Sequence, residues 1–129
     1  MLRLSKKADY ALIAMKHLAQ KSPGAQSSNA REIAEHYDIP IELMAKVLQR
    51  LVRARLLASH QGIRGGYGLG RPAPAISVAD VIQAIDGPLT VTACSTEKSD
   101  CEQYSKCSIR DSLWQIRERI AAALGTVTL

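Results

Sequence analysis

The residues best suited to do chemistry are three cysteines, the only ones in the chain, at positions 94, 101 and 107. Their spacing is C-x6-C-x5-C, within one polar stretch. An odd number of neighbouring thiols cannot close into a set of disulfides, so the pattern favours a metal centre. Zinc and iron–sulfur clusters are both held by cysteine thiolates, and both usually require four ligands. One ligand must therefore come from elsewhere.

Length and hydropathy favour a cytoplasmic protein with one domain and an appended arm. The chain has 129 residues, enough for one modest core. Charged residues interrupt every apolar stretch near the N-terminus, and no run approaches the roughly eighteen apolar residues of a membrane span. We therefore expect no membrane partner. In the reducing cytoplasm thiols stay free, which again favours metal or redox chemistry at the cysteines.

The basic residues are concentrated in the first half of the chain. Residues 1–71 carry twelve Lys and Arg against five Asp and Glu, whereas residues 72–129 carry five against seven. Such asymmetry is typical of a surface that binds a polyanion such as DNA. A lysine-rich solvated face would give the same composition.

Three helices are predicted in the first half. Apolar residues recur at helical spacing from Ser5 to about Gln20. Asn29 and Glu32 fit a capping box for a second helix, and Pro40 suits the first position of a third. The third helix has a six-residue apolar stripe: Leu43, Met44, Val47, Leu48, Leu51 and Val52.

A short helix, a tight break and a longer helix form the outline of a helix-turn-helix. The outward face of the third helix carries long polar side chains that could reach phosphates and base edges in a major groove, namely Glu42, Lys46, Gln49, Arg50 and Arg53. An ordinary amphipathic helix would also present a polar, solvated face.

A β-hairpin is predicted directly after the third helix. Residues 56–60 and 67–70 read as two strands around a tip with three glycines and Arg64. Glycines allow close approach to a sugar-phosphate backbone, and an arginine on a narrow loop suits the minor groove. A generic glycine-rich turn is the alternative. His60, beside the wing, could touch a phosphate, although its position favours an ordinary surface histidine.

The last part of the chain has a different composition. Ser77 and Asp80 fit a capping box for a fourth helix that Gly87 and Pro88 end. A final helix, from about residue 108 to 124, has a heptad-like apolar seam that we expect to pair with a second protomer, the alternative being packing against its own core. The expected fold is mainly α: a winged helix-turn-helix with a small β-hairpin wing and a C-terminal dimerisation helix.

Several segments together are similar to one family. They are Leu2-Arg3-Leu4-Ser5-Lys6 with Asp9-Tyr10-Ala11-Leu12, Gly65-Gly66-Tyr67-x-Leu69, residues 76–82 and the three cysteines. This pattern resembles the winged-helix iron–sulfur transcriptional regulators of the Rrf-two type, which include the Isc and Suf cluster-assembly regulators and nitric-oxide-sensing repressors. The opening motif and Asp86-Gly-Pro-Leu89 look most similar to the Suf-type regulators. The resemblance implies a homodimer that binds double-stranded DNA at a palindromic operator.

The resemblance also implies a cofactor, an iron–sulfur cluster on Cys94, Cys101 and Cys107, with 2Fe-2S favoured and 4Fe-4S as the alternative. A histidine three residues after the last cysteine can be the fourth ligand in this family, but that position is Arg110, a permanent cation. Other members use an acidic residue of the first helix, donated by the opposite protomer, and the matching position is Asp9. A helix-cap or ion-pair role with Lys6, Lys7 or Arg3 is the alternative for Asp9.

Two further departures concern the cysteine loop and the recognition helix. The loop has one residue more between its first two cysteines than is usual in the family, a change that ligation tolerates. A base-reading trio of the Isc-type members falls here on Glu42, Ala45 and Lys46, and Ala45 can form no side-chain hydrogen bond. The operator sequence is therefore not transferable from those members.

These observations predict a repressor of a Suf-type cluster-assembly operon whose DNA affinity is set by the cluster. We expect residues 1–86 to form the DNA-binding domain, 87–107 the cluster-binding loop and 108–129 the dimerisation helix and tail. The expected DNA-binding residues are Ser5, Lys6, Arg31, Glu42, Lys46, Gln49, Arg50, Arg53, His60, Arg64, Gly65, Gly66 and Tyr67. A structural-zinc or direct thiol-redox regulator without a cluster is the alternative. An enzyme is not expected, because the sequence holds no catalytic constellation.

Overall fold

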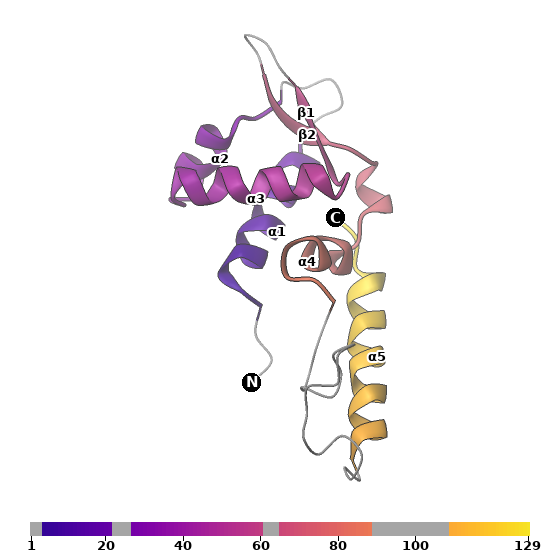
Figure 1. Cartoon of the computed structure of the whole chain (residues 1–129). Coiled ribbons are helices and arrows are strands. Elements are labelled where there is room, and N and C mark those ends of the chain that lie inside the picture. The colour runs from indigo at the N-terminus through magenta and orange to yellow at the C-terminus, as the bar shows by residue number, and fades with distance from the viewer. Residues whose placement is uncertain (1–3, 22–26, 61–64, 89–108) are drawn as a thin grey trace.

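The computed structural model describes residues 4–21, 27–60, 65–88 and 109–129. These residues form α1 (Lys6–Ala19), α2 (Ala30–His36), α3 (Ile41–Arg53), β1 (Leu57–His60), β2 (Gly66–Leu69), a 3₁₀ turn (Ala73–Ala75), α4 (Val78–Asp86) and α5 (Arg110–Thr126). Figure 1 shows the first four helices gathered in a head, with the hairpin rising from one side and α5 extending from the other. The mainly helical, winged fold predicted from the sequence is confirmed.

The core of the head lies between α3 and α1. The inner stripe of α3 has four side chains that are at most 1% exposed: Met44, Val47, Leu48 and Leu51. Facing them, α1 contributes Ala11, Ala14 and Met15, all fully buried, and the small alanines allow the two helices to approach closely. Leu43 and Val52, also predicted for the stripe, are only half-buried. Burying each large apolar side chain is worth about 1.5–3 kcal/mol, so this stripe fixes the rotation of α3 about its axis.

Each helix of the helix-turn-helix, α2 and α3, is followed by a left-handed residue that is not glycine. After α2, Asp38 has φ 54°, and the N–H of Ile39 donates to the carbonyl of Ala34 at 2.9 Å. After α3, Arg55 has φ 63°, and the N–H of Leu56 donates to the carbonyl of Leu51 at 3.0 Å. This is the Schellman pattern, in which the residue beyond the turn is apolar and buried.

Local capping follows the sequence closely. The Ser77 hydroxyl accepts from the Asp80 N–H, and the Asp80 carboxylate accepts from the Ser77 N–H, both at 3.0 Å, so the predicted capping box of α4 is present. Asn29 accepts from the Glu32 N–H at 2.8 Å, but Glu32 accepts from the Asn29 side-chain amide instead of its backbone. Pro40 is the N-cap of α3 rather than its first helical residue.

The wing is a two-stranded antiparallel hairpin with an added bridge. β1 and β2 pair from Leu57 with Leu69 to His60 with Gly66. On the other edge of β2, the N–H of Tyr67 donates to the Ser28 carbonyl at 2.7 Å, and the Ser28 N–H donates back at 3.3 Å. A Cβ on Gly66 would lie 2.6 Å from the Ser28 carbonyl oxygen. Glycine at position 66 is therefore needed for this close backbone approach.

The C-terminal residues return to the head. The N–H of Val78 donates to the Val127 carbonyl at 2.8 Å, and the N–H of Leu129 donates to the Ile76 carbonyl at 3.1 Å. Leu129 also packs against the core. Consequently the last turns of α5 lie beside α4, while its first turns project away from the head (Figure 1).

We expect Gly66→Ala to lower the free energy of unfolding by about 1–3 kcal/mol, because the added methyl group has no room against the Ser28 carbonyl. Gly125→Ala is the matched control, since no atom lies within 4 Å of a Cβ at that helical position. The control should be neutral or slightly stabilising. Urea unfolding followed by circular dichroism measures both, and equal stability of the two variants would contradict the close-approach argument.

Candidate nucleic-acid interface

The polar face predicted for α3 is exposed. Glu42, Lys46, Gln49, Arg50 and Arg53 all present their side chains on the surface of the head, opposite the buried stripe. Because the stripe is fixed by packing, this face is held in one orientation. A helix of this kind presents long side chains to a groove of DNA without rearrangement.

A cationic cavity lies beside this face. It has a volume of about 240 Å³ and is lined by Lys7, Lys46, Val47, Gln49, Arg50, Arg53 and Ile85. The lining thus contains four cationic side chains, from α1 and α3, and no carboxylate. Such a concentration of like charge is suited to an anion such as a phosphate. Lys7 was not among the predicted DNA-binding residues, because its sequence position does not reveal its proximity to α3.

A second hollow, of about 260 Å³, connects α3 with the wing. Its lining residues are Gln49, Val52, Arg53, Ser59 and Tyr67. Arg53 lines both hollows, so the exposed face of α3 and the hairpin form one continuous surface. His60 is exposed on β1, at the end nearer the wing tip. Arg64, which was predicted to contact DNA, lies outside the described residues.

Several predicted DNA-binding residues also have structural contacts. Tyr67 is partly buried against the core, and Gly66 is buried beneath Ser28. Ser5 caps α1 by accepting from the Ala8 N–H at 3.0 Å. The Ser5 hydroxyl donates to the Asp86 carboxylate, 2.7 Å from Oδ2 and 2.9 Å from Oδ1.

Arg50 is tied to α4. Its Nη1 donates to the backbone carbonyl of Ile85 at 2.9 Å. In contrast, Lys6 and Arg31 are simply exposed, on α1 and α2, and Gly65 is half-buried before β2. The predicted set therefore divides into freely presented side chains and side chains that also hold the head together.

A scan against protein-family models matches residues 4–129 to the Rrf2 model, described as iron-dependent transcriptional regulators. The chain belongs to the Rrf2 family. Rrf2 proteins are transcriptional regulators rather than enzymes. None of the helices formed by the described residues has the length and hydrophobicity needed to cross a bilayer.

Individual Rrf2 relatives agree with this assignment. The chain is 35% identical to the HTH-type transcriptional regulator IscR of Yersinia pseudotuberculosis, over 99% of this chain and 77% of IscR. It is 42% identical over 88 residues to an HTH-type regulator of Mycobacterium tuberculosis, which is 68% of this chain and 54% of that protein. The chain thus spans about half the length of the mycobacterial relative.

Solved Rrf2 structures have the same fold along nearly the whole chain. CymR, the global cysteine regulator of B. subtilis, matches with a TM-score of 0.77 and 27% identity, covering 99% of this chain and 93% of CymR. T. potens IscR matches with a TM-score of 0.75 and 27% identity, covering 98% and 82% of the two chains.

Of the four candidate metal ligands, this structure describes only Asp9. Cys94, Cys101 and Cys107 lie outside the described residues. Asp9 is exposed in the first turn of α1, and it forms no ion pair with Lys6 or Lys7, whereas Arg3 lies outside the described residues. No group of three potential ligands occurs within the part of the chain that the structure describes. The donor chemistry of three thiols and one carboxylate fits an iron–sulfur cluster or zinc.

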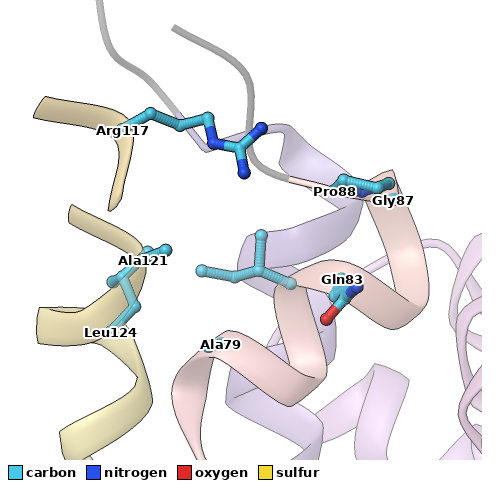
Figure 2. Close-up of a pocket in the computed structure, with 8 residues that line it drawn as sticks. Ala79, Gln83, Gly87, Pro88, Arg117, Ala121 and Leu124 are labelled. Carbon is cyan, nitrogen blue, oxygen red and sulfur yellow. The ribbon is translucent and has the colours of Figure 1, made fainter. Parts of the chain in front are cut away.

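A further cavity lies between α4 and α5. It has a volume of about 170 Å³, and Ile82, Ala121 and Leu124 are among its apolar lining residues. Figure 2 shows Arg117 extending from α5 toward α4, near Gly87 and Pro88, where the chain leaves the head. The Arg117 guanidinium also lies 4.8 Å from the centroid of the Trp114 ring and 2.7 Å from the Glu118 carboxylate.

A cluster of two histidines and a tyrosine, where the last turn of α1 meets the end of α2, was not predicted. His17 and His36 lie with ring centroids 5.4 Å apart, and His17 Nδ1 is 3.0 Å from the Tyr37 hydroxyl. Partial burial, followed by the nearby charges of Lys21 and His36, lowers the pKa of His17 below its ordinary 6.5, while Glu32 acts in the opposite direction. Helical spacing alone cannot reveal this cluster, because its members come from two helices.

The lowered pKa predicts that stability falls as the medium becomes acidic. Below about pH 6.5 the unfolded chain protonates His17 more readily than the folded chain does, so the free energy of unfolding decreases as pH falls. We expect His17→Gln to reduce this decrease between about pH 7.5 and about pH 5.5. Urea unfolding at each pH gives the comparison, and identical pH slopes in variant and wild type would contradict it.

Proposed function

We propose that this chain is a transcriptional repressor whose affinity for a palindromic operator is set by an iron–sulfur cluster on Cys94, Cys101 and Cys107. The observation that carries the DNA-binding part is the cationic cavity beside the exposed face of α3. Membership of a family described as iron-dependent supports the metal-responsive part. A chromosomal target places the protein in the cytoplasm.

On the DNA side, Lys46, Gln49 and Arg53 are exposed where α3 would enter a major groove. Phosphates of the flanking backbone would occupy the cationic cavity, with Lys7 contributing from α1. Each neutralised phosphate releases condensed counterions, so affinity should fall steeply with salt. The wing, with Arg64 at its tip, would contact the adjacent minor groove.

On the metal side, the three thiolates would hold a 2Fe-2S cluster, with Asp9 of the opposite protomer as the fourth ligand. Such a cluster supplies a redox- and oxidant-sensitive centre. Carboxylate is a weaker ligand for iron than thiolate, which makes the centre exchangeable. Holding all three thiolates on one cluster would constrain residues 94–107, which lie in sequence between α4 and α5. The likeness of residues 2–6 and 86–89 to Suf-type regulators supports a cluster-assembly operon as the target.

The proposed repressor is a homodimer, and residues 108–129, which include α5, form its interface. Ile109 is 54% exposed and Ile116 is 45% exposed on this helix, with the partly buried Leu113 and Ile120 on the same seam. The seam of a second copy would cover these side chains. A two-fold dimer would also place two α3 helices about 34 Å apart, as a palindromic operator requires.

Direct thiol oxidation is the second candidate, and one comparison favours it. Staphylococcus aureus CymR has been solved in an oxidised form, and that structure matches this chain with a TM-score of 0.75 and 26% identity, covering 98% and 92% of the two chains. In this alternative the cysteines would respond to oxidants without a metal, because thiolates oxidise reversibly to sulfenic acid or disulfide. Structural zinc on the same thiols would give a colourless protein.

We expect anaerobically purified protein to be coloured and to contain iron and sulfide, whereas Cys101→Ala should lose both. The variant should also bind operator DNA with an affinity changed by roughly 5- to 150-fold, the range of typical allosteric coupling. Visible absorption, iron analysis and fluorescence anisotropy provide the measurements. Colourless wild-type protein whose affinity responds to peroxide would favour thiol oxidation, and bound zinc would favour a structural metal.

We expect Ile116→Glu to weaken the dimer by at least about tenfold, because a charge would replace an apolar side chain in the seam. Gln115→Glu is the matched control, since it introduces the same charge at the adjacent exposed position. Analytical ultracentrifugation over a concentration series measures both dissociation constants. If both variants remain dimers as stable as the wild type, α5 is not the dimer interface.

A further inference from the structure

Two hydrogen bonds join the C-terminal end of α4 to the elements of the DNA interface. Arg50 of α3 donates to the carbonyl of Ile85 at 2.9 Å, and the Ser5 hydroxyl, at the start of α1, donates to Asp86 at 2.7 Å. Ile85 and Asp86 are the last two residues of α4. Only Gly87 and Pro88 separate them from the segment 89–108, which carries all three cysteines.

The Arg50 contact has a clear electrostatic basis. The last carbonyls of a helix have no partner within the helix and carry the negative end of its dipole. The Arg50 guanidinium supplies a cationic donor to one of them from a neighbouring helix. A guanidinium has five N–H donors, so the bond to Ile85 leaves others able to bind a second acceptor.

A second acceptor, such as a phosphate, could reach Arg50 on the same side of α3. Arg50 and Ile85 both line the cationic cavity, together with Lys7, Lys46 and Arg53. A phosphate oxygen in this cavity and the last turn of α4 would therefore be held by one side chain. A movement of the last turn of α4 would therefore change the position of the Arg50 guanidinium relative to the phosphate.

We propose that Arg50 is a positioning residue that couples the state of the cysteine segment to DNA affinity, by binding the C-terminal end of α4 and an operator phosphate at the same time. This rests on the proposed function, because it assumes that the cysteine segment senses a signal. Ser5 adds a parallel connection. Its hydroxyl caps α1 and binds Asp86, so the first turn of α1, which carries Lys7 and Asp9, is attached to the same end of α4.

The test compares the affinity of cluster-loaded and cluster-free protein for one duplex, selected from a random-sequence library with the wild type. We expect a ratio of roughly 5 to 150 between the two wild-type forms. Arg50→Ala should weaken binding and bring this ratio close to one. Arg53→Ala is the matched control: it removes the same charge from the same cavity, but Arg53 has no bond to α4 in the described structure.

The control should weaken both forms by the same factor and keep the wild-type ratio. Both arginine variants should lower the salt slope by about one unit if each binds a phosphate. An Arg50→Ala ratio equal to the wild-type ratio would overturn the coupling role while leaving cluster regulation intact. A wild-type ratio of one would instead overturn the proposed function together with this inference, so the two failures are distinguishable.

Asp86→Ala removes the parallel connection, from Ser5 to the end of α4, without changing a cation, and it can be measured even if Arg50→Ala does not fold. We expect it to reduce the ratio and leave the salt slope unchanged, since a carboxylate binds no phosphate. A second measurement uses cluster-free protein only. If Arg50 connects the cysteine segment to the DNA interface, saturating DNA should also change the rate at which iodoacetamide alkylates the cysteines in the wild type but not in Arg50→Ala. Equal rates with and without DNA in the wild type would contradict the proposal.

Discussion

The two-sided character of α3 is the constraint on which the head depends. One helix of 13 residues buries four large apolar side chains against α1 and presents five polar ones outward. Rotating the helix by one position would expose part of this stripe, at about 1.5–3 kcal/mol for each side chain lost from the core. The outward face is therefore oriented by the packing on the opposite side, before any DNA is present. The Schellman turns then fix where the helix begins and ends.

Most of the fold could be predicted because its signals are local. The apolar periodicity placed α1 to within one residue at each end. The Ser77–Asp80 capping box, recognised from two residue types three positions apart, and Gly87 placed both ends of α4. The hairpin was predicted from two short strand-like segments around a glycine-rich tip. In each case the stabilising contacts lie within one element or between sequence neighbours. The left-handed residues Asp38 and Arg55 were missed, because neither is the glycine that usually indicates such a turn.

The rest of the site could not be predicted because its contacts join distant parts of the chain. Helical spacing identified Arg50 as an outward residue, but its bond to Ile85 depends on how α4 packs beside α3. The same holds for the Ser5–Asp86 bond, across 81 positions of sequence, and for the Tyr67–Ser28 bridge. Lys7 joins the cationic cavity for this reason. Polar residues on a predicted face can thus be identified from sequence, whereas their second partners require the tertiary arrangement.

These second partners also explain how a cluster of cations is tolerated in a small head. Four cationic side chains around one cavity repel one another, and this repulsion destabilises the folded state when no anion is present. The bond from Arg50 to the end of α4 offsets part of this cost, because the helix terminus carries partial negative charge. Lys46 and Arg53 form no ion pair within the described structure, so a bound anion would relieve their repulsion. A polyanion that binds the folded head and not the unfolded chain must then stabilise the fold itself. Affinity for DNA and incomplete charge compensation are two consequences of the same arrangement of α1, α3 and α4.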